Sequence, residues 1–335
     1  MTLGWTDELH AAWRDCGLAA RPARVSRLDR GWSTLLLAPG GPELRVRNIG
    51  ADVAVGDWVV PSADGERVEL VLPRSSAFVR RASFEGDRAL AHTIAANIDV
   101  VALLHTLTAV PNQRRLEREL VLAFDSGARP VVVLTKPDLV DAAKAASSVA
   151  TMRSVAPDVS VLVASGVTGE GVGEVRSLAS GATLALLGSS GVGKSTLVNA
   201  LVGADVRVTN DVRGGDQRGR HTTTASQLIE LAPWPGLRRG WLIDTPGVRA
   251  VSLWSSGRGI ERAFADVFEL MDRCRFRDCK HDDEPGCAVS AAVEAGMLDP
   301  LRLASMKRLV AEEAKLEDEQ RAQAKAQDRR GVRRH

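Results

Sequence analysis

One short stretch of the sequence combines glycines, a lysine and a serine at the spacing of a phosphate-binding loop. It reads Gly188-Ser-Ser-Gly-Val-Gly-Lys194-Ser195. Gly191 and Gly193 let backbone N–H groups turn toward an anion, and a helix starting at Lys194 directs its positive end at the same point. Lys194 would neutralise β- and γ-phosphate oxygens, and the Ser195 hydroxyl would ligate Mg²⁺. The alternative is a glycine-rich turn that matches by chance. The candidate nucleotide-binding residues are Gly188, Ser189, Ser190, Gly191, Val192, Gly193, Lys194, Ser195 and Thr196.

A second stretch, Asp244-Thr-Pro-Gly247, follows the apolar residues 241–243. Its Asp-x-x-Gly pattern is typical of a sensor of metal and γ-phosphate. Asp244 would hold Mg²⁺ through water, and the Gly247 N–H would meet the γ-phosphate. These four residues also suit an ordinary turn, so the prediction depends on the phosphate loop upstream.

A third stretch, Thr135-Lys-Pro-Asp138, could read a guanine base. The Asp138 carboxylate can accept hydrogen bonds from guanine N1–H and its amino group, whereas adenine presents an acceptor at N1. Lys136 could lie flat over the base. The usual first residue is Asn, and Thr135 offers only a hydroxyl. Ser165 opens a glycine-containing segment, residues 165–171, that fits a further base-contacting loop. A plain loop between strand and helix is the alternative.

A metal site is predicted near the carboxyl end by Cys274, Cys279, His281 and Cys287. Three thiolates and an imidazole suit a closed, tetrahedral, structural Zn²⁺ site. The alternative is a set of buried cysteines beside a surface histidine. The neighbouring acids, residues 282–284, are hard ligands and are interpreted as solvated.

Composition is ordinary for a globular protein: 335 residues, 44% hydrophobic, 26% charged and a net charge of +2. The first ten residues have no apolar core, so no signal peptide is expected, and no apolar run reaches the ~20 residues of a membrane helix. Four cysteines, three of them clustered, favour metal binding in a reducing compartment over disulfides. We therefore expect a cytoplasmic protein.

The predicted elements place each motif directly after a strand. A helix is expected over 6–16, and short alternating apolar stretches over 21–73 predict a small β-barrel, either an OB-fold or an SH3-like barrel. From about 90 to 250, buried strands at 99–104, 131–134, 159–163, 183–187 and 241–243 alternate with helices, which is typical of a doubly wound α/β domain. Ligands bind at the carboxyl ends of such strands. Beyond 260 the pattern is helical and charged, with a polar, frayed end from Arg321.

The order of the motifs is unusual, because the base reader precedes the phosphate loop and the sensor. In this order, and with Gly56-Asp-Trp-Val59, Asn112-Gln-Arg-Arg-Leu-Glu-Arg118 and Gly219-Arg-His-Thr-Thr-Thr224, the chain resembles the RsgA family of circularly permuted GTPases that act in small-ribosomal-subunit biogenesis. The likeness runs from about Val25 to Leu309. Thr135 and Gly166 depart from the Asn and Ala that are commoner there.

The resemblance implies an α/β fold with three parts. These are an OB-fold, a circularly permuted P-loop GTPase domain and a helical zinc-binding domain. The corresponding boundaries are 1–20 for an N-terminal helix, 21–75 for the barrel, 76–255 for the GTPase domain, and 256–335 for the zinc-binding domain with its basic tail.

The resemblance also implies roles for the segment between phosphate loop and sensor. Thr223 looks like the switch threonine that joins Ser195 on Mg²⁺, and His221 looks like a catalytic residue, acting with Lys194. Val248 stands where many GTPases have a water-orienting Gln, so unassisted hydrolysis should be slow. The implied reaction is GTP hydrolysis to GDP and phosphate, stimulated by the small ribosomal subunit and followed by release from it.

RNA contacts are predicted from basic residues at both ends of the chain. Barrel arginines with Trp32 and Trp58 nearby could bind backbone phosphates and stack a base, although a solvated barrel face explains them nearly as well. The arginines concerned are Arg21, Arg24, Arg27, Arg30, Arg45 and Arg47, with Arg329, Arg330, Arg333 and Arg334 in the tail.

The expected partners are GTP/GDP and the small ribosomal subunit with its rRNA. We expect the protein to be a monomer and to have no membrane partner. A nucleotide-gated RNA-binding scaffold with incidental hydrolysis is the alternative, and an ATP-using relative is disfavoured by Asp138.

Overall fold

The computed structural model describes residues 4–81, 91–203, 226–244, 258–282 and 284–331. The chain forms two compact units, named here the sheet unit and the helical unit. The sheet unit holds all the strands together with α1, α3, α4 and α5; the helical unit holds α2 and α6 to α9. The boundaries expected at residues 20, 75 and 255 remain predictions. The division by contacts places barrel and GTPase strands in one unit.

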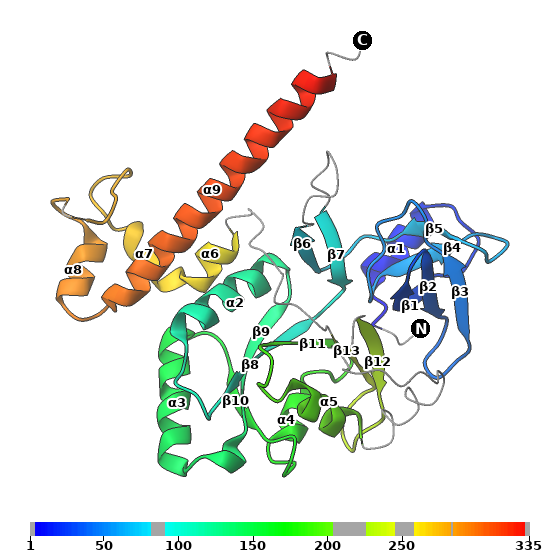
Figure 1. The fold of residues 1–335 in the computed structure, drawn as a ribbon, viewed down its shortest axis with the longest axis horizontal. Coiled ribbons are helices and arrows are strands. Elements are labelled where there is room, and N and C mark those ends of the chain that lie inside the picture. Colours follow the sequence, from blue (N-terminus) through cyan, green and yellow to red (C-terminus); the bar gives the residue numbers. More distant parts are fainter. Residues whose placement is uncertain (1–3, 82–90, 204–225, 245–257, 283, 332–335) are drawn as a thin grey trace, which may run out of the picture. The chain divides into compact units, whose positions relative to one another are not determined.

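The sheet unit is built on one mixed sheet of eleven strands (Figure 1). Its main path runs β10-β9-β8-β11-β13-β12-β1-β2-β3, with β4 paired to β1 and β5 to β4. The strands β6 and β7 form a separate antiparallel pair. The strand bounds are β1 Ala23–Asp29, β2 Trp32–Leu36, β3 Glu43–Arg47, β4 Trp58–Pro61, β5 Val68–Val71, β6 Ala77–Arg81, β7 Ala91–Ala96, β8 Val100–Thr106, β9 Arg129–Thr135, β10 Val161–Ala164, β11 Thr183–Gly188, β12 Gln227–Leu231 and β13 Gly240–Asp244.

The parallel part of this sheet confirms the predicted α/β fold. β10, β9, β8, β11 and β13 run parallel, because helical crossovers connect them, and β12 is antiparallel to β13. Their side chains are buried almost continuously, as expected for a sheet covered on both faces. Two helices, α4 (Val172–Ser177) and α5 (Lys194–Val202), pack together against one face, and Val175, Leu197 and Leu201 join its core.

The other helices of the sheet unit begin and end as their sequences predict. α1 (Asp7–Asp15) begins after Thr6, whose hydroxyl accepts the Leu9 N–H. α3 (Ala142–Val155) begins after Asp141, whose carboxylate accepts the Lys144 N–H. A short 3₁₀ turn, η1 (Pro137–Leu139), carries the predicted base-reading carboxylate.

The predicted OB-fold barrel is not seen as a closed barrel. β1 to β5 pair in the order β3-β2-β1-β4-β5. In the part of the chain that the structure describes, the remaining edge between β3 and β5 holds a single bridge, Arg47–Arg67, in place of a ladder.

The helical unit contains α2 (Gln113–Asp125), α6 (Arg258–Ala263), α7 (Ala265–Met271), α8 (Ala288–Glu294) and α9 (Pro300–Gly331). Arg302 on α9 is buried and donates to both carboxylate oxygens of Asp266 on α7, at 2.6 Å each. Arg118 on α2 makes a similar two-bond pair with Glu312 on α9, at 2.8 Å. The frayed end predicted from Arg321 is wrong, because α9 continues through Gly331 (Figure 1). This segment is rich in Ala, Gln, Lys and Arg, which favour helix.

Candidate nucleotide and metal sites

The predicted phosphate loop lies between β11 and α5, as a strand–loop–helix unit. Gly191 and Gly193 have φ angles of +79° and +97°, which a residue with a side chain rarely adopts. Gly188 lies so close to β8 that a Cβ atom there would be 2.9 Å from Leu104 Cβ. The backbone at these positions therefore requires glycine, and α5 begins at Lys194, directly after the loop, so that the positive end of the helix is directed at the loop.

The predicted sensor carboxylate meets the loop lysine. Lys194 Nζ lies 2.9 Å from Asp244 Oδ1, and Asp244 is largely buried at the end of β13. The register Ala185–Ile243 between β11 and β13 brings the two strand ends together. A cation for phosphate oxygens and a carboxylate for a hydrated Mg²⁺ thus share one end of the sheet.

The predicted base reader is hydrogen-bonded to the same loop. Thr135, the last residue of β9, donates its hydroxyl toward the Val192 carbonyl at 2.5 Å, with the His105 carbonyl at 3.1 Å. Since a hydroxyl carries one proton, it can donate to only one of these carbonyls at a time. Lys136 has φ +63° and donates from Nζ to the Gly191 carbonyl at 2.6 Å. Two side chains of the base reader therefore hold the phosphate loop.

The carboxylate that would read guanine is oriented by the second base loop. Ser165 is buried, and its hydroxyl donates to Asp138 Oδ1 at 2.5 Å. The Ser165 oxygen accepts the backbone N–H groups of Val167 and Thr168 at 3.2 and 3.1 Å. Asp138 itself is exposed, so its free oxygen can accept hydrogen bonds from a ligand.

The structure gives a reason for Gly166, which stands where alanine is commoner in the family that the sequence resembles. A Cβ at Gly166 would lie 2.7 Å from the Thr196 carbonyl carbon and 2.8 Å from the Leu197 nitrogen, both in the backbone of α5. The second base loop thus rests directly on the helix that follows the phosphate loop. Sequence reasoning noted the glycine but had no signal for this contact.

Some predicted residues lie outside the part of the chain that the structure describes. These are the switch residues His221 and Thr223, the sensor glycine Gly247, and Val248. Their roles remain predictions.

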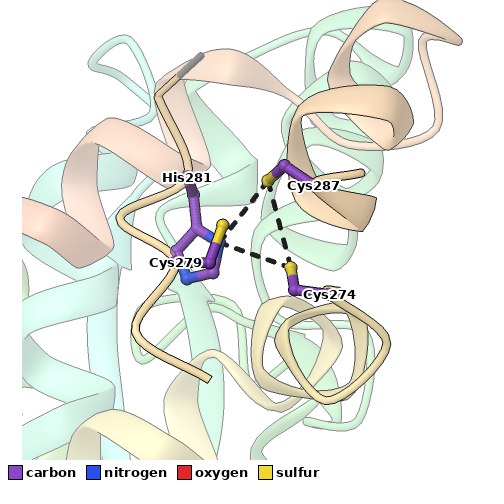
Figure 2. A group of neighbouring side chains, drawn as sticks. All are labelled: Cys274, Cys279, His281 and Cys287. Carbon is purple, nitrogen blue, oxygen red and sulfur yellow. Dashed lines mark hydrogen bonds between the residues drawn. The ribbon is translucent and has the colours of Figure 1, made fainter. Parts of the chain in front are cut away.

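The predicted metal ligands come together in the helical unit (Figure 2). One ligand atom from each of Cys274, Cys279, His281 and Cys287 lies within 4.8 Å of the others. His281 Nδ1 is 3.6 Å from both the Cys274 and Cys287 sulfurs, and these sulfurs are 3.9 Å apart. A tetrahedral zinc ion with ordinary bond lengths requires edges of about 3.6 Å for N–S and 3.8 Å for S–S. The four side chains fit a zinc ion, with His281 binding through Nδ1.

Hydrogen bonds from neighbouring groups favour the ionised, metal-binding form of Cys287. Cys287 precedes α8, and its sulfur accepts the Ser290 N–H and hydroxyl at 3.3 Å. Burial opposes ionisation of Cys287, but these hydrogen bonds and one from His281 lower its pKa to about 6. The thiolate is the form that binds a metal.

The acids beside His281 are not simply solvated, as the sequence suggested. Glu284 accepts the backbone N–H groups of Lys280 and Asp282 at 2.9 Å, and these bonds lower its pKa to about 2. Lys307 on α9 donates to the Asp282 carboxylate at 2.6 Å and to the His281 carbonyl at 2.9 Å. Lys307 was missed because it is 26 residues from His281 in sequence.

The structure corrects the predicted RNA-binding surface of the barrel. Arg24 and Trp58 are each 1% exposed, so neither can contact RNA. Arg24 donates to the Asn97 carbonyl at 3.0 Å and the Thr183 hydroxyl at 2.8 Å, and burial lowers its pKa to about 10. It links β1 to the start of β11. Sequence reasoning could not distinguish a buried arginine from the exposed ones around it.

An exposed basic group remains on β2 and β3. The guanidinium groups of Arg45 and Arg47 lie 5.1 and 5.4 Å from the ring centre of Trp32. We call these three residues the Trp32 group. Arg21, Arg27 and Arg30 are also exposed. The tail arginines 333 and 334 lie outside the described residues, and the tail arginines 329 and 330 lie in α9. Among the described helices, none is long and apolar enough to cross a membrane.

Comparisons with known proteins agree with this arrangement. The sequence matches the RsgA GTPase family over residues 71–254. It is 40% identical to the small ribosomal subunit biogenesis GTPase RsgA of Streptomyces coelicolor, covering 99% of this chain and 91% of that protein. It is 41% identical to RsgA 2 of Vibrio parahaemolyticus, covering 87% and 79%.

Solved structures show the same fold. YjeQ from Thermotoga maritima superposes with a TM-score of 0.63 at 25% identity, over 88% of this chain and 98% of that one. YloQ, described as a circularly permuted GTPase, gives a TM-score of 0.62 at 20% identity, over 88% and 95%. The sheet, the converging nucleotide motifs and these likenesses lead to one conclusion: this chain belongs to the RsgA family of circularly permuted GTPases.

Proposed function

We propose that this GTPase acts in late maturation of the small ribosomal subunit in the cytoplasm, as a monomer. The subunit stimulates its hydrolysis of GTP, and the protein is released once GDP has formed. The names of its relatives support the subunit as partner. The observation that carries the nucleotide part is the set of hydrogen bonds from Thr135 and Lys136 to the phosphate loop, with Asp138 oriented by Ser165. Base and triphosphate sites then form one pocket.

The roles of the residues follow from this pocket. The loop from Gly188 to Ser195 cradles the phosphates, Asp138 selects guanine, and Ser165 holds Asp138 in place. Ser195, Thr223 and Asp244 are the residues that would hold Mg²⁺, which supplies positive charge to the β- and γ-phosphate oxygens. His221 orients the attacking water, because Val248 lacks a group that could do so.

One surface outside the pocket supports a role on the ribosome. The Trp32 group offers two cations and an aromatic face, a combination that binds single-stranded RNA through phosphates and base stacking. The zinc cluster is structural, since four protein ligands leave no position for water. A zinc ion held by these four residues would fix the loop between α7 and α8.

Turnover measured with and without purified small subunits tests the proposal. GTP hydrolysis should be slow alone and rise at least tenfold with small subunits, because a partner can position His221 against the attacking water. Large subunits provide the control. His221→Ala should keep binding to the subunit and lose the stimulated rate. Equal rates with and without small subunits would favour the scaffold alternative.

Release is tested by sedimentation with small subunits. The protein should co-sediment with a non-hydrolysable GTP analogue and stay in the supernatant with GDP. Equal sedimentation in both states would contradict release on hydrolysis.

The guanine reader can be tested separately with Asp138→Asn. An amide donates where guanine also donates, so GTP affinity should fall by at least tenfold. Xanthine has a carbonyl in place of the guanine amino group, so the variant should gain affinity for XTP relative to wild type. Unchanged GTP and XTP binding would exclude Asp138 from the base site.

A further inference from the structure

The strand β1 belongs to the barrel at one end and to the GTPase sheet at the other. Ala23 and Arg24 pair with Val59 and Trp58 on β4. Beyond an irregularity between Val25 and Arg27, Arg27 pairs with Gln227 on β12. This shift in register is typical of a β-bulge, in which one extra residue bends the strand and lets it pass from one sheet to another. The second half of β1 therefore lies beside the strands of the nucleotide site.

The pairing places Arg27 in register with the sensor carboxylate. Arg27 pairs with Gln227, and Gln227 pairs with Asp244 on β13. Residues directly paired across antiparallel strands point to the same face of a sheet. Two strand spacings separate Arg27 from Asp244, which is roughly 10 Å between Cα atoms.

The direction of β1 brings its charged end to the ligand side of the sheet. β1 and β13 are both antiparallel to β12, so their carboxyl ends lie at the same edge. Arg27 leans along β1 toward this edge, with its Nε 3.7 Å from Asp29 Oδ2. Both side chains are nearly half exposed, at 46% and 42%. Arg45 on β3 places a second cation 3.9 Å from the same Asp29 oxygen. The Asp29 carboxylate and the Arg27 cation thus lie near the place where Asp244 and Lys194 would meet the γ-phosphate.

We propose that Arg27 and Asp29 determine how strongly this site prefers nucleoside triphosphate over diphosphate. Neither residue touches the nucleotide; each acts through its field on the extra negative charge of GTP. Arg27 favours the triphosphate and Asp29 opposes it. Two unit charges about 10 Å apart near a protein surface change an equilibrium constant by about two- to tenfold at low ionic strength. The proposal goes beyond the ribosomal function and does not depend on it.

The test uses Arg27→Gln and Asp29→Asn in the full-length protein. Affinities for fluorescent GDP and for a fluorescent non-hydrolysable GTP analogue are measured with Mg²⁺ in about 20 mM salt. The ratio of analogue affinity to GDP affinity should fall about two- to tenfold in Arg27→Gln and rise by a similar factor in Asp29→Asn. Both changes should shrink toward wild type at about 0.5 M salt, where the Debye length is only about 4 Å.

A second arginine–acid pair at the same spacing provides the control. Arg67 Nη2 lies 3.2 Å from Glu69 Oε2 at the start of β5, also exposed and outside the sheet path that leads to Asp244. Arg67→Gln and Glu69→Gln should leave the ratio unchanged. If both β1 variants lower the ratio, the pair acts only as a structural link. If neither moves it, or if high salt leaves the shifts intact, the field does not reach the site. Each of these results overturns the proposal.

Discussion

At Gly166 the absence of a side chain decides how two loops meet. The sequence has a glycine where alanine is commoner in the family it resembles, and offers no reason for it. The structure supplies the reason, because the backbone of α5 occupies the space a Cβ would need. A contact between residues thirty positions apart leaves no local pattern, so sequence alone could not predict it.

Gly166→Ala should move the second base loop away from α5. The overlap with backbone atoms of Thr196 and Leu197 cannot be relieved by a side-chain rotation, so a cost of about 1–3 kcal/mol is expected. Since Ser165 orients Asp138, guanine-nucleotide affinity should also fall, by roughly tenfold. Thermal unfolding and GDP titration measure the two effects.

Gly173→Ala is the matched control for this substitution. Gly173 lies in α4 with no atom within 4 Å of a built Cβ, so alanine there should be neutral or slightly stabilising. If Gly166→Ala behaves like Gly173→Ala in both measurements, the close approach has no consequence for binding.

Arg24 is the residue at which sequence interpretation and structure differ most. The sequence groups it with Arg21 and Arg27 as an RNA contact, because all three precede or enter the predicted barrel and Trp32 and Trp58 are nearby. The structure buries it, and its guanidinium donates to the carbonyls of Gly56, just before β4, and Asn97, just after β7. The sequence identifies the arginines, but only the pairing of β1 with β4 shows which of their side chains point into the interior.

Arg24→Met should destabilise the sheet unit. Methionine fills similar space but leaves the Asn97 carbonyl and the Thr183 hydroxyl without this donor. Stranding buried polar groups in this way should lower the free energy of unfolding by about 3 kcal/mol. Urea denaturation followed by Trp fluorescence measures the change. Arg21→Met, at an exposed arginine, should have little effect. Equal losses of unfolding free energy in both variants would contradict the role of Arg24 in linking β1 to β11.

At the scale of elements, the pattern of apolar residues, together with the turn residues between the apolar runs, predicts most of the parallel sheet. The buried strands at 99–104, 131–134, 183–187 and 241–243 match β8, β9, β11 and β13 to within a few residues, because continuous apolar runs are typical of parallel strands. The elements that were not predicted depend on distant partners. The pair β6–β7 is Ala- and Arg-containing, with little apolar alternation, and nine residues, 82–90, separate its two strands in the sequence.

A residue of α9, Lys307, holds the loop between α7 and α8 that carries the predicted zinc ligands. None of the four ligands lies on α9 itself. His281 has a left-handed backbone, φ +60°, and Lys307 donates to its carbonyl and to the next side chain. Lys307→Met should weaken zinc binding about 10- to 100-fold, the range typical for groups that orient metal ligands. Competition with a chromophoric chelator measures the affinity.

Lys315→Met provides the comparison, because Lys315 is exposed on the same helix. It should leave zinc affinity unchanged. Should Lys307→Met also bind zinc as wild type does, the loop holds its geometry without α9.

At the scale of the whole molecule, the motif order has a mechanical consequence. The chain leaves the nucleotide site at Asp244 and reaches α6, in the helical unit, through residues 245–257. In an unpermuted GTPase, the segment after the sensor stays within its own domain. We therefore expect a change at the γ-phosphate to act on a connection to a second unit.

The mean separation of the sheet unit and the helical unit should therefore depend on the nucleotide. Distances between spin labels, one on an exposed residue of β3 and one on α8, should shift between GDP and a GTP analogue. Small-angle scattering should show a matching change in radius of gyration. Superimposable distance distributions and profiles in the two states would contradict this coupling, while leaving nucleotide binding unaffected.

The pairing of β1 with β12 has a consequence for what this molecule can bind. Without β1, β12 would be the last strand of the GTPase sheet, with unpaired N–H and C=O groups open to any extended peptide. The chain fills that position with a segment of its own. A partner that adds a strand to this sheet must then use another edge, such as that of the end strand β10, because β1 already occupies the position beside Gln227 of β12.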